Sequence, residues 1–414
     1  MGSMVRNPKG VRSMAKGMSG TKSKGILLMG LFALFAQSLF YAGMACADRP
    51  AVGTVIDETN WVQYKGYLAT AVQKLMEKGY LSYRVVERHK HVPLPTDPWT
   101  EKCKDKAKIG ADDELIDYCN AGIPFPVVDP KDPKGGAKVY WNQDKRYTGD
   151  TAVISPATVY LIDKHGHERS FTAEMLYYKA TERTVLPPIP SVPDTDVRAY
   201  IRINTLAPFD MKGFAVLMQI ARYELKLPDQ QWAYVPMLRR VRRMSTALKG
   251  DSFAGTDETY ADSYPGAPFE FASRIVERKE MLMCAYCDEA CMKNILENRK
   301  GFKIFYLPVE LTETYVVDVV PKDKNYHYSK YVYYIDSEYW GIQLKECYDL
   351  KGDLWKLHSF YGVLGCGAVG AAGVSSMMDL QADHMTFHDG TKFKYNEDIP
   401  LKEFSPARLK ELGQ

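Results

Sequence analysis

The sequence has little that would identify an enzyme. It contains no P-loop, and its serine, histidine and acidic residues show no spacing that supports a catalytic triad or a glycosidase pair of carboxylates. It has one CxxC but no second one, and it has no CxxCH sequence for attaching haem. It has no internal repeat and no low-complexity tract, so a repeat architecture is not expected. We therefore expect a protein that holds another molecule without covalent chemistry, and we expect no cofactor and no bound metal.

The first 47 residues lack acidic side chains, which favours a targeting segment. Six basic residues precede an apolar run, Ile26–Ala42, and a small-x-small sequence, Ala45-Cys46-Ala47. This pattern predicts a signal peptide cleaved before Asp48, and hence a periplasmic protein that could associate with the outer membrane. One alternative is an uncleaved membrane anchor. Another is a lipid on Cys46, although a lipobox would have an aliphatic residue where this sequence has Gly43.

The mature chain lacks a strong net charge. Without the six basic residues of the signal segment, 48 basic and 51 acidic residues remain. A nearly neutral chain is not a general nucleic-acid binder, so we expect no nucleic-acid partner. Cysteine is also sparse, and the odd number of seven mature cysteines leaves at least one thiol unpaired or paired between chains. Because an exported protein folds in an oxidising compartment, we expect disulfides.

Aromatic residues are abundant, and the pattern in which they occur predicts strands. The chain has 28 tyrosines and 16 phenylalanines, and aromatic side chains suit half-buried sheet surfaces. Short alternating segments bounded by turn residues predict strands over 152–162, 168–179, 198–204, 213–223, 269–283, 303–307, 314–320, 328–336, 341–350, 354–358 and 384–387. Helices are predicted over 57–79 and 405–412.

These segments predict a mainly β fold with few helices. The expected architecture is a large curved antiparallel sheet, an open half-barrel closed by helices. Three parts are predicted along the chain: the signal peptide (1–47), a helical and irregular segment that wraps the barrel (48–150), and the half-barrel with a C-terminal helix (151–414).

The stretch Gln231–Arg243, QWAYVPMLRRVRR, is the clearest candidate for a binding wall. With a period of two, Trp232 and Tyr234 share one face of a strand, and Ala233 lies on the other. Both faces are apolar until the arginines begin, as in a wall that runs from an apolar interior to a charged rim. The predicted ligand-binding residues are Trp232, Tyr234, Leu238, Arg240 and Arg242.

The arginines of this stretch permit three interpretations. They could bind nucleic acid, but export argues against that. They could form a solvated face paired with Asp257, Glu258 and Asp262. They could also contact an anionic headgroup, because guanidinium groups bind phosphate with two parallel hydrogen bonds.

The cysteines form the most specific local motif. Zinc sites, iron–sulfur clusters and thiol oxidoreductases use the CxxC spacing of Cys284 and Cys287. No fourth ligand and no thioredoxin-like surrounding accompanies it, so we interpret this cluster as structural disulfides with open pairing. The residues 103 and 119 lie at a spacing that a loop-closing disulfide could bridge. The disulfide candidates are Cys103, Cys119, Cys284, Cys287 and Cys291.

Three weaker patterns predict no site. His165 and His167 flank a glycine and are interpreted as turn residues. His384 and His388 have helical spacing, but their segment is predicted to be a strand. Gly362–Gly373 contains GxGxxG, which indicates nucleotide binding only between a strand and a helix of a parallel unit, so we expect a loop.

Four blocks in order along the chain carry a resemblance to a known family. They are GIPFPVVDPKDPKGGAKVYWNQDKRYTG at 122–149, WAYVPMLRRVRR at 232–243, FAGTDETYADSYPGAPFEFASRIVERKEM at 253–281, and YVVDVVPKDKNYHYSKYVYYIDSEYWGIQLKECYDLKGDLWK at 315–356. On these blocks the chain resembles the exported proteins grouped as domain of unknown function 1329, distant relatives of the outer-membrane lipoprotein-sorting carriers. The 284–291 cysteine cluster and the 362–373 glycine-rich segment are extra to the family pattern.

The resemblance implies a curved sheet around an apolar cavity, and a carrier for a lipid or another hydrophobic molecule. It also implies an RND-type transporter or an outer-membrane protein as partner, with peripheral membrane contact. Shielding an acyl chain from water contributes about 0.8 kcal/mol per buried CH₂, which can hold a lipid without covalent help. Two rival functions remain: a scaffold for an envelope transporter with a filled barrel, and a thiol-redox or metal protein built on Cys284, Cys287 and Cys291.

Overall fold

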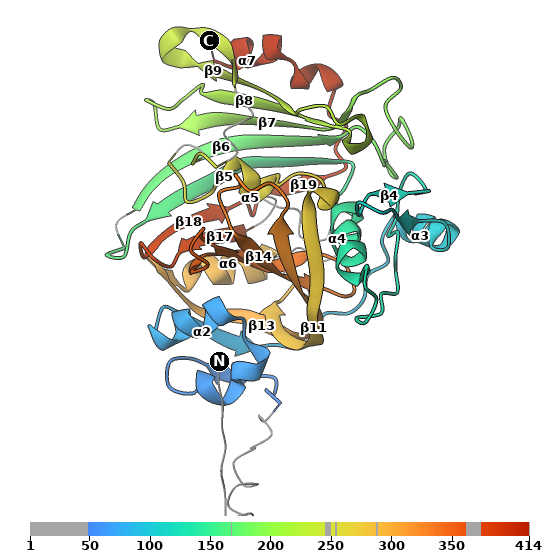
Figure 1. Cartoon of the computed structure of the whole chain (residues 1–414). Coiled ribbons are helices and arrows are strands. Elements are labelled where there is room, and N and C mark those ends of the chain that lie inside the picture. The colour runs from blue at the N-terminus through green and yellow to red at the C-terminus, as the bar shows by residue number, and fades with distance from the viewer. Residues whose placement is uncertain are drawn as a thin grey trace, which may run out of the picture. The chain divides into compact units, whose positions relative to one another are not determined.

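The computed structural model describes residues 49–166, 168–244, 250–252, 255–286, 289–361 and 374–413 (Figure 1). The chain divides at Asp48, and all of the described residues belong to the unit Arg49–Gln414.

Six consecutive strands form the first half of a large sheet, each antiparallel to the next. They are β5 (Thr151–Ile162), β6 (Glu168–Lys179), β7 (Val197–Ala207), β8 (Ala215–Ala221), β9 (Gln230–Val235) and β10 (Arg240–Met244). Val216 on β8 lies opposite Ile203 on β7 and Ala233 on β9. Side chains opposite one another share a sheet face, and these three belong to one apolar cluster. We call this the inner face of β6–β9.

The second half of the sheet is a further antiparallel series that rejoins the first at β5. Its strands are β11 (Phe271–Cys284), β12 (Arg299–Lys300), β13 (Lys303–Pro321), β14 (Lys330–Asp336), β15 (Ile342–Tyr348), β16 (Leu354–Tyr361), β17 (Val374–Asp379), β18 (His384–Asp389) and β19 (Phe393–Tyr395). Phe387 on β18 lies opposite Tyr160 on β5, and β19 pairs with the first part of β5. The β5 strand therefore joins the two halves (Figure 1).

The sheet is open, as the sequence predicts. In the described part of the chain, the end strand β10 pairs with β9 alone and the end strand β11 pairs with β13 alone. The mainly β fold with few helices is therefore confirmed. Some details differ from expectation. The strands predicted over 303–307 and 314–320 are one strand, β13, the helix predicted over 57–79 is a 3₁₀ turn at 61–67 followed by a helix at 70–77, and the sheet is mixed. The short β1 (Val55–Ile56) pairs with β2 (Leu81–Val85), which runs parallel to β13.

Helices and 3₁₀ turns cover parts of the sheet. The helices are α2 (Thr70–Glu77), α3 (Asp97–Cys103), α4 (Gly135–Lys145), α5 (Tyr260–Ser263), α6 (Glu289–Glu297) and α7 (Pro406–Leu412). The 3₁₀ turns are η1 (Trp61–Tyr67), η2 (Tyr223–Leu225), η3 (Pro236–Leu238), η4 (Pro268–Glu270) and η5 (Leu401–Phe404), and a two-stranded sheet joins β3 (Lys108–Ile109) to β4 (Leu115–Ile116). Ser405 caps α7 by accepting a hydrogen bond from the backbone N–H of Arg408, as its Ser-Pro start predicts. None of the described helices is long and apolar enough to cross a membrane.

Helix α4 lies close against β11, and glycine permits the approach. A Cβ added at Gly136 would lie 2.2 Å from the carbonyl oxygen of Ser273 on β11. One turn later, Tyr140 and Trp141 are buried in the apolar cluster that α4 shares with β13 and β14. Burying each such side chain contributes about 1.5–3 kcal/mol, so this packing fixes the position of the helix end, which carries the polar residues described next.

Candidate binding cavity

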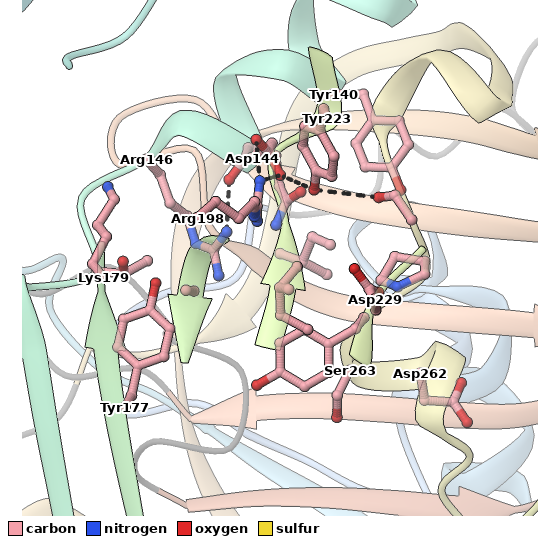
Figure 2. Close-up of a pocket in the computed structure, with 18 of the residues that line it drawn as sticks. Tyr140, Asp144, Arg146, Tyr177, Lys179, Arg198, Tyr223, Asp229, Asp262 and Ser263 are labelled. Carbon is pink, nitrogen blue, oxygen red and sulfur yellow. Dashed lines mark hydrogen bonds and ion pairs between the residues drawn. The ribbon is translucent and has the colours of Figure 1, made fainter. Parts of the chain in front are cut away.

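A small cavity lies between the inner face of β6–β8, the end of α4 and the segment around α5. Its volume is about 180 Å³. Its apolar lining includes Met175, Tyr177, Ala199 and Ile220 from β6–β8, and Ile342 and Phe360 from β15 and β16. Figure 2 shows Arg198 beside Asp144 at the end of α4, with Arg146 and Lys179 on the same side of the cavity, while Asp229, Asp262 and Ser263 lie on another side.

Asp144 is the centre of the polar network. Nη1 of Arg198 lies 3.2 and 3.3 Å from its two carboxylate oxygens, and the Tyr223 hydroxyl donates to it at 2.9 Å. Lys145 lies 3.2 Å from Asp144 and 2.6 Å from Glu182. Burial alone would raise the pKa of the Asp144 carboxyl, but Arg198 and Lys145 outweigh burial and hold that pKa well below its usual range. Asp144 is therefore ionised at neutral pH.

This end of the cavity carries an excess of positive charge. Three cationic side chains line this end, Arg146, Lys179 and Arg198, against two carboxylates, Asp144 and Glu182, and Lys145 pairs with both carboxylates from outside the lining. Asp229, Asp262 and Lys345 line the cavity elsewhere. Burial lowers the pKa of Lys179, against the opposing effect of Glu182, and burial also lowers the pKa of Arg146. Both shifts mean that the folded protein disfavours these positive charges, so an added anion at this end would stabilise them.

The other wall of the cavity is formed by a segment that contacts both halves of the sheet. We call residues 255–266 the bridging segment. Its Tyr260 and Tyr264 side chains pack on the apolar inner face of β6–β9, and Ser263 and Tyr264 line the cavity. A capping box between Thr259 and Asp262 forms the short helix α5 in the middle of the segment.

Polar contacts attach the bridging segment to the second half of the sheet. Asp257 lies 2.8 Å from Nδ1 of His384, and Glu258 lies 2.9 Å from Nε2 of His388. The ammonium group of Lys345 donates to the carbonyl oxygen of Asp262 at 2.7 Å. The segment therefore joins β6–β9 by apolar contacts and β15–β18 by polar ones.

Sequence patterns alone did not predict where the proposed binding residues lie. Tyr234 is buried beneath α7 in an apolar cluster with Leu409, and Trp232 packs against the same cluster. They lie on the outer face of β9, while Ala233 lies on the inner face. Because both faces of this strand are apolar, a period of two could not tell which one faces inward. A ligand contact for Trp232 or Tyr234 stays a prediction.

The remaining predicted residues lie beyond the end of β9. The expected single strand turns at η3, where Arg239 has φ +52°, and returns as β10. Leu238 is 44% exposed at this turn. Arg240 and Arg242 lie opposite Val235 and Ala233 on an exposed end strand and do not line the cavity. The expectation that the arginines pair with Asp257, Glu258 and Asp262 is wrong, because those acids pair with His384, His388 and Lys345.

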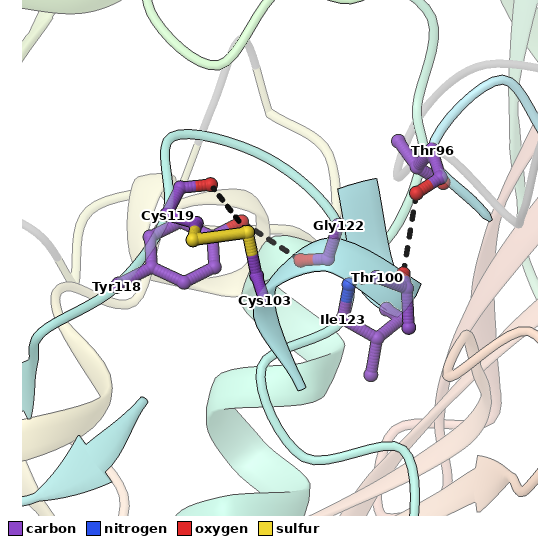
Figure 3. Close-up of a disulfide and its surroundings, with 7 residues drawn as sticks. All are labelled: Thr96, Thr100, Cys103, Tyr118, Cys119, Gly122 and Ile123. Atoms are coloured by element: carbon purple, nitrogen blue, oxygen red, sulfur yellow. Dashed lines mark hydrogen bonds between the residues drawn. A yellow bond between two sulfur atoms is a disulfide. The ribbon is translucent and has the colours of Figure 1, made fainter. Parts of the chain in front are cut away.

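The cysteines divide into bonded and free ones. Cys103 and Cys119 form the expected loop-closing disulfide, with Cα atoms 5.7 Å apart. Figure 3 shows this bond between α3 and the loop before Ile123, whose N–H donates to Thr100 Oγ1 at 2.8 Å. Ile123 then enters the apolar cluster under α4. The disulfide thereby anchors the chain that leads into α4.

The prediction that Cys284 forms a disulfide is wrong. Cys284 ends strand β11 as a free, buried thiol, and Cys347 is free and buried as well. Burial raises the pKa of the Cys284 thiol to about 12, which makes it unreactive. Cys291 is disulfide-bonded, and Cys287 lies outside the described residues, as do His167 and the GxGxxG segment. Among the described residues, no group of histidine, cysteine and acidic side chains could hold a metal ion.

The open sheet and its inner cavity define a mainly β half-barrel protein. The chain belongs to the family described as "Protein of unknown function (DUF1329)", whose model matches residues 55–410. The family resemblance noted from the sequence blocks is thus confirmed.

A solved member of the same family has a similar fold. The chain is 22% identical over 399 residues to Uncharacterized protein PA3922 of Pseudomonas aeruginosa, covering 90% of this chain and 84% of that protein. The crystal structure of a DUF1329 family protein from Desulfovibrio piger is similar with a TM-score of 0.51 at 19% identity, covering 68% of this chain and 100% of that one. A putative outer membrane lipoprotein-sorting protein domain from Vibrio parahaemolyticus has a TM-score of 0.48 at 18% identity, covering 66% and 98%. At these identities the likeness concerns the fold alone.

Proposed function

We propose that this protein binds and carries a hydrophobic molecule with an anionic group, and that it is not an enzyme. The observation that carries the proposal is the pairing of two surfaces around one cavity. The apolar inner face of β6–β9 meets the bridging segment there. The cationic end at Arg146, Lys179 and Arg198 lies beside it. An acyl chain would contact the first surface and its headgroup the second.

The size of the cavity sets a condition on this function. A volume of about 180 Å³ is smaller than the roughly 300–1,000 Å³ of ordinary ligand pockets. A long acyl chain therefore enters only when the bridging segment withdraws and Tyr260 and Tyr264 leave the inner face. Ten buried methylenes contribute about 8 kcal/mol. This is of the same order as the cost of withdrawal, which breaks three polar anchors at roughly 1–3 kcal/mol each and exposes two tyrosine side chains at about 1.5–3 kcal/mol each.

The place of action is part of the proposal. The signal-like N-terminus and the Cys103–Cys119 disulfide support an exported protein, because disulfides persist in oxidising compartments. We propose that the protein works in the periplasm beside the outer membrane, as an accessory to an RND-type exporter or an outer-membrane protein. A scaffold with a filled interior is the second candidate, and the small cavity volume is the observation that favours it.

Binding of matched amphiphiles tests the proposal. Isothermal titration with palmitate and with hexadecyltrimethylammonium compares an anionic and a cationic group on equal chains. We expect palmitate to bind about tenfold more tightly, since the cavity end has net positive charge. Ala199→Leu, which fills the cavity, should weaken palmitate binding, whereas Ala272→Leu at an exposed site on β11 should not. Equal binding of both amphiphiles would refute the preference for an anionic group. No binding of either would refute the carrier and favour the scaffold.

A further inference from the structure

Two turns of the sheet carry apolar side chains that are almost fully exposed. Phe209, between β7 and β8, is 93% exposed, and Met237, between β9 and β10, is 92% exposed. Leu238, next to Met237, is 44% exposed. Single exposed apolar residues are common on protein surfaces, so the significance lies in their grouping.

The two turns lie side by side at one end of the strands. Ala215, which begins β8, pairs with Asn204 near the end of β7 and with Tyr234 near the end of β9. Neighbouring strands are about 4.8 Å apart, so the β7–β8 and β9–β10 turns are about two strand spacings apart. Figure 1 shows β7, β8 and β9 as neighbours in the upper part of the sheet.

The base beneath these turns is tightly packed. Met211, in the same turn as Phe209, packs against the apolar cluster of β5 and β6. A Cβ at Gly213 would lie 3.2 Å from the Cα of Gly413, and a Cβ at Gly413 would overlap the Tyr234 ring. The β7–β8 turn is thus held against the C-terminal end of α7 and β9. Phe209 is therefore exposed on a turn that is packed against its neighbours, and not on a loose loop.

The same end of the sheet is strongly basic. The hairpin 236–244 contains four arginines and no acid, and the neighbouring turn adds Lys212 against the single acid Asp210. The four arginines are exposed and form no ion pair with any described residue. Exposed apolar tips surrounded by arginine and lysine are the pattern with which proteins bind the surface of an anionic membrane.

We propose that the β7–β8 and β9–β10 turns dock the protein on an anionic lipid bilayer. Phe209 and Met237 enter the headgroup layer, and Arg239, Arg240 and Lys212 contact lipid phosphates. The apolar contact is confined to separate tips rather than spread over a flat patch, which suits a lipid surface better than a protein interface. Docking does not depend on the cavity, so it stands or falls separately from the carrier function.

Vesicle co-sedimentation tests the docking surface. The experiment uses the unit Arg49–Gln414, because the apolar run of residues 26–42 would bind membranes by itself. We expect binding to vesicles of phosphatidylglycerol and phosphatidylcholine in equal parts, and weak binding to phosphatidylcholine alone. Phe209→Ser with Met237→Ser should reduce binding about tenfold or more. The control Val127→Ser, which is 89% exposed elsewhere, should leave it unchanged.

The charge contribution is measured separately. Replacing Arg239 and Arg240 by glutamine should weaken binding about fivefold for each arginine, and added salt should reduce the difference. The proposal is overturned if the tip variants sediment like the unmodified protein, or if anionic vesicles are not bound at all. It is also overturned if those variants lose a protein partner while keeping vesicle binding. Palmitate binding by the tip variants should remain unchanged.

Discussion

Asp144 at the end of α4 and Arg198 at the start of β7 form an ion pair at 3.2 Å that joins the helix to the sheet across 54 residues of sequence. Arg198 also stacks over the Tyr223 ring, 4.2 Å from its centre. This guanidinium therefore connects α4, β7 and η2, and it fixes the polar side chains at the cationic end of the cavity.

Removing this guanidinium should destabilise the fold. Arg198→Gln leaves the Asp144 carboxylate, which is only 10% exposed, with Lys145 as its ion-pair partner. We expect a loss of about 2–4 kcal/mol in the free energy of unfolding, measured by urea denaturation. Arg222→Gln removes a surface pair with Glu224 and should cost less than about 1 kcal/mol. Equal effects of the two substitutions would contradict the structural role of Arg198.

The anchor between His388 and Glu258 should depend on pH. Glu258 raises the pKa of His388 above its usual value, against the lowering effect of burial. Burial alone would raise the pKa of Glu258, but His388 more than offsets burial and lowers this pKa to about 2. The histidine contribution is fully present below pH 6.5 and is lost as pH rises through the raised pKa. The carboxylate contribution is present above pH 4.5 and is lost as pH falls toward 2.

His388→Gln should therefore lower stability more at about pH 5.5 than at about pH 8. His358 lies 3.6 Å from Glu258, and burial lowers its pKa to about 3, so it acts in the opposite direction. Because His388 is one of the groups that lower the pKa of His358, the substitution is compared in a His358→Gln background. An effect of the substitution that is the same at both pH values would show that the pair is not ionic.

The approach of α4 to β11 should tolerate no side chain at Gly136. Gly136→Ala places its Cβ 2.2 Å from the Ser273 carbonyl oxygen, and overpacking of this kind costs about 1–3 kcal/mol. Gly66→Ala is the matched control, because nothing lies within 4 Å of the added atom. Thermal unfolding should show a lower melting temperature for the first variant only.

The disulfide should stabilise the chain that leads into α4. Cys103 and Cys119 are separated by 16 residues, and closing a loop of that length contributes about 3 kcal/mol. Cys103→Ser should reduce stability by about that amount in urea denaturation. The substitution isolates this bond, whereas a reductant would also break the disulfide of Cys291. Alkylation of the native protein should spare Cys284 and Cys347, which are buried; rapid labelling of either would contradict their burial.

The strands could be predicted because their patterns are local. Alternation and turn residues gave β5, β6, β7, β8 and β11 close to their observed bounds. The parallel pairing of β2 with β13 joins segments more than 200 residues apart, and no local pattern encodes such a contact. The sequence predicts two short strands in place of the 19-residue strand β13, because Pro308 interrupts the alternation of apolar and polar residues.

The cavity was harder to predict than the fold. Asp144 and Arg198 lie in segments of ordinary composition, and only the packing of α4 brings them together. His384 and His388 are assigned no site from sequence because their helical spacing falls on a predicted strand. Their partners, Asp257 and Glu258, are more than 120 residues away, and no local pattern encodes that pairing. Trp232 and Tyr234 lie on a strand as predicted, but that strand ends at Val235, and its two apolar faces left the inward one undetermined.

Mass spectrometry of organic extracts tests the central claim most directly. The protein is purified without detergent from cells that produce it naturally, and the extract is compared with that of the cavity-filling variant Ala199→Leu. We predict an acidic amphiphile that is bound in a fixed ratio to the unmodified protein and depleted in the variant. An extract free of any hydrophobic molecule, with an interior that stays closed to added palmitate, would contradict a carrier.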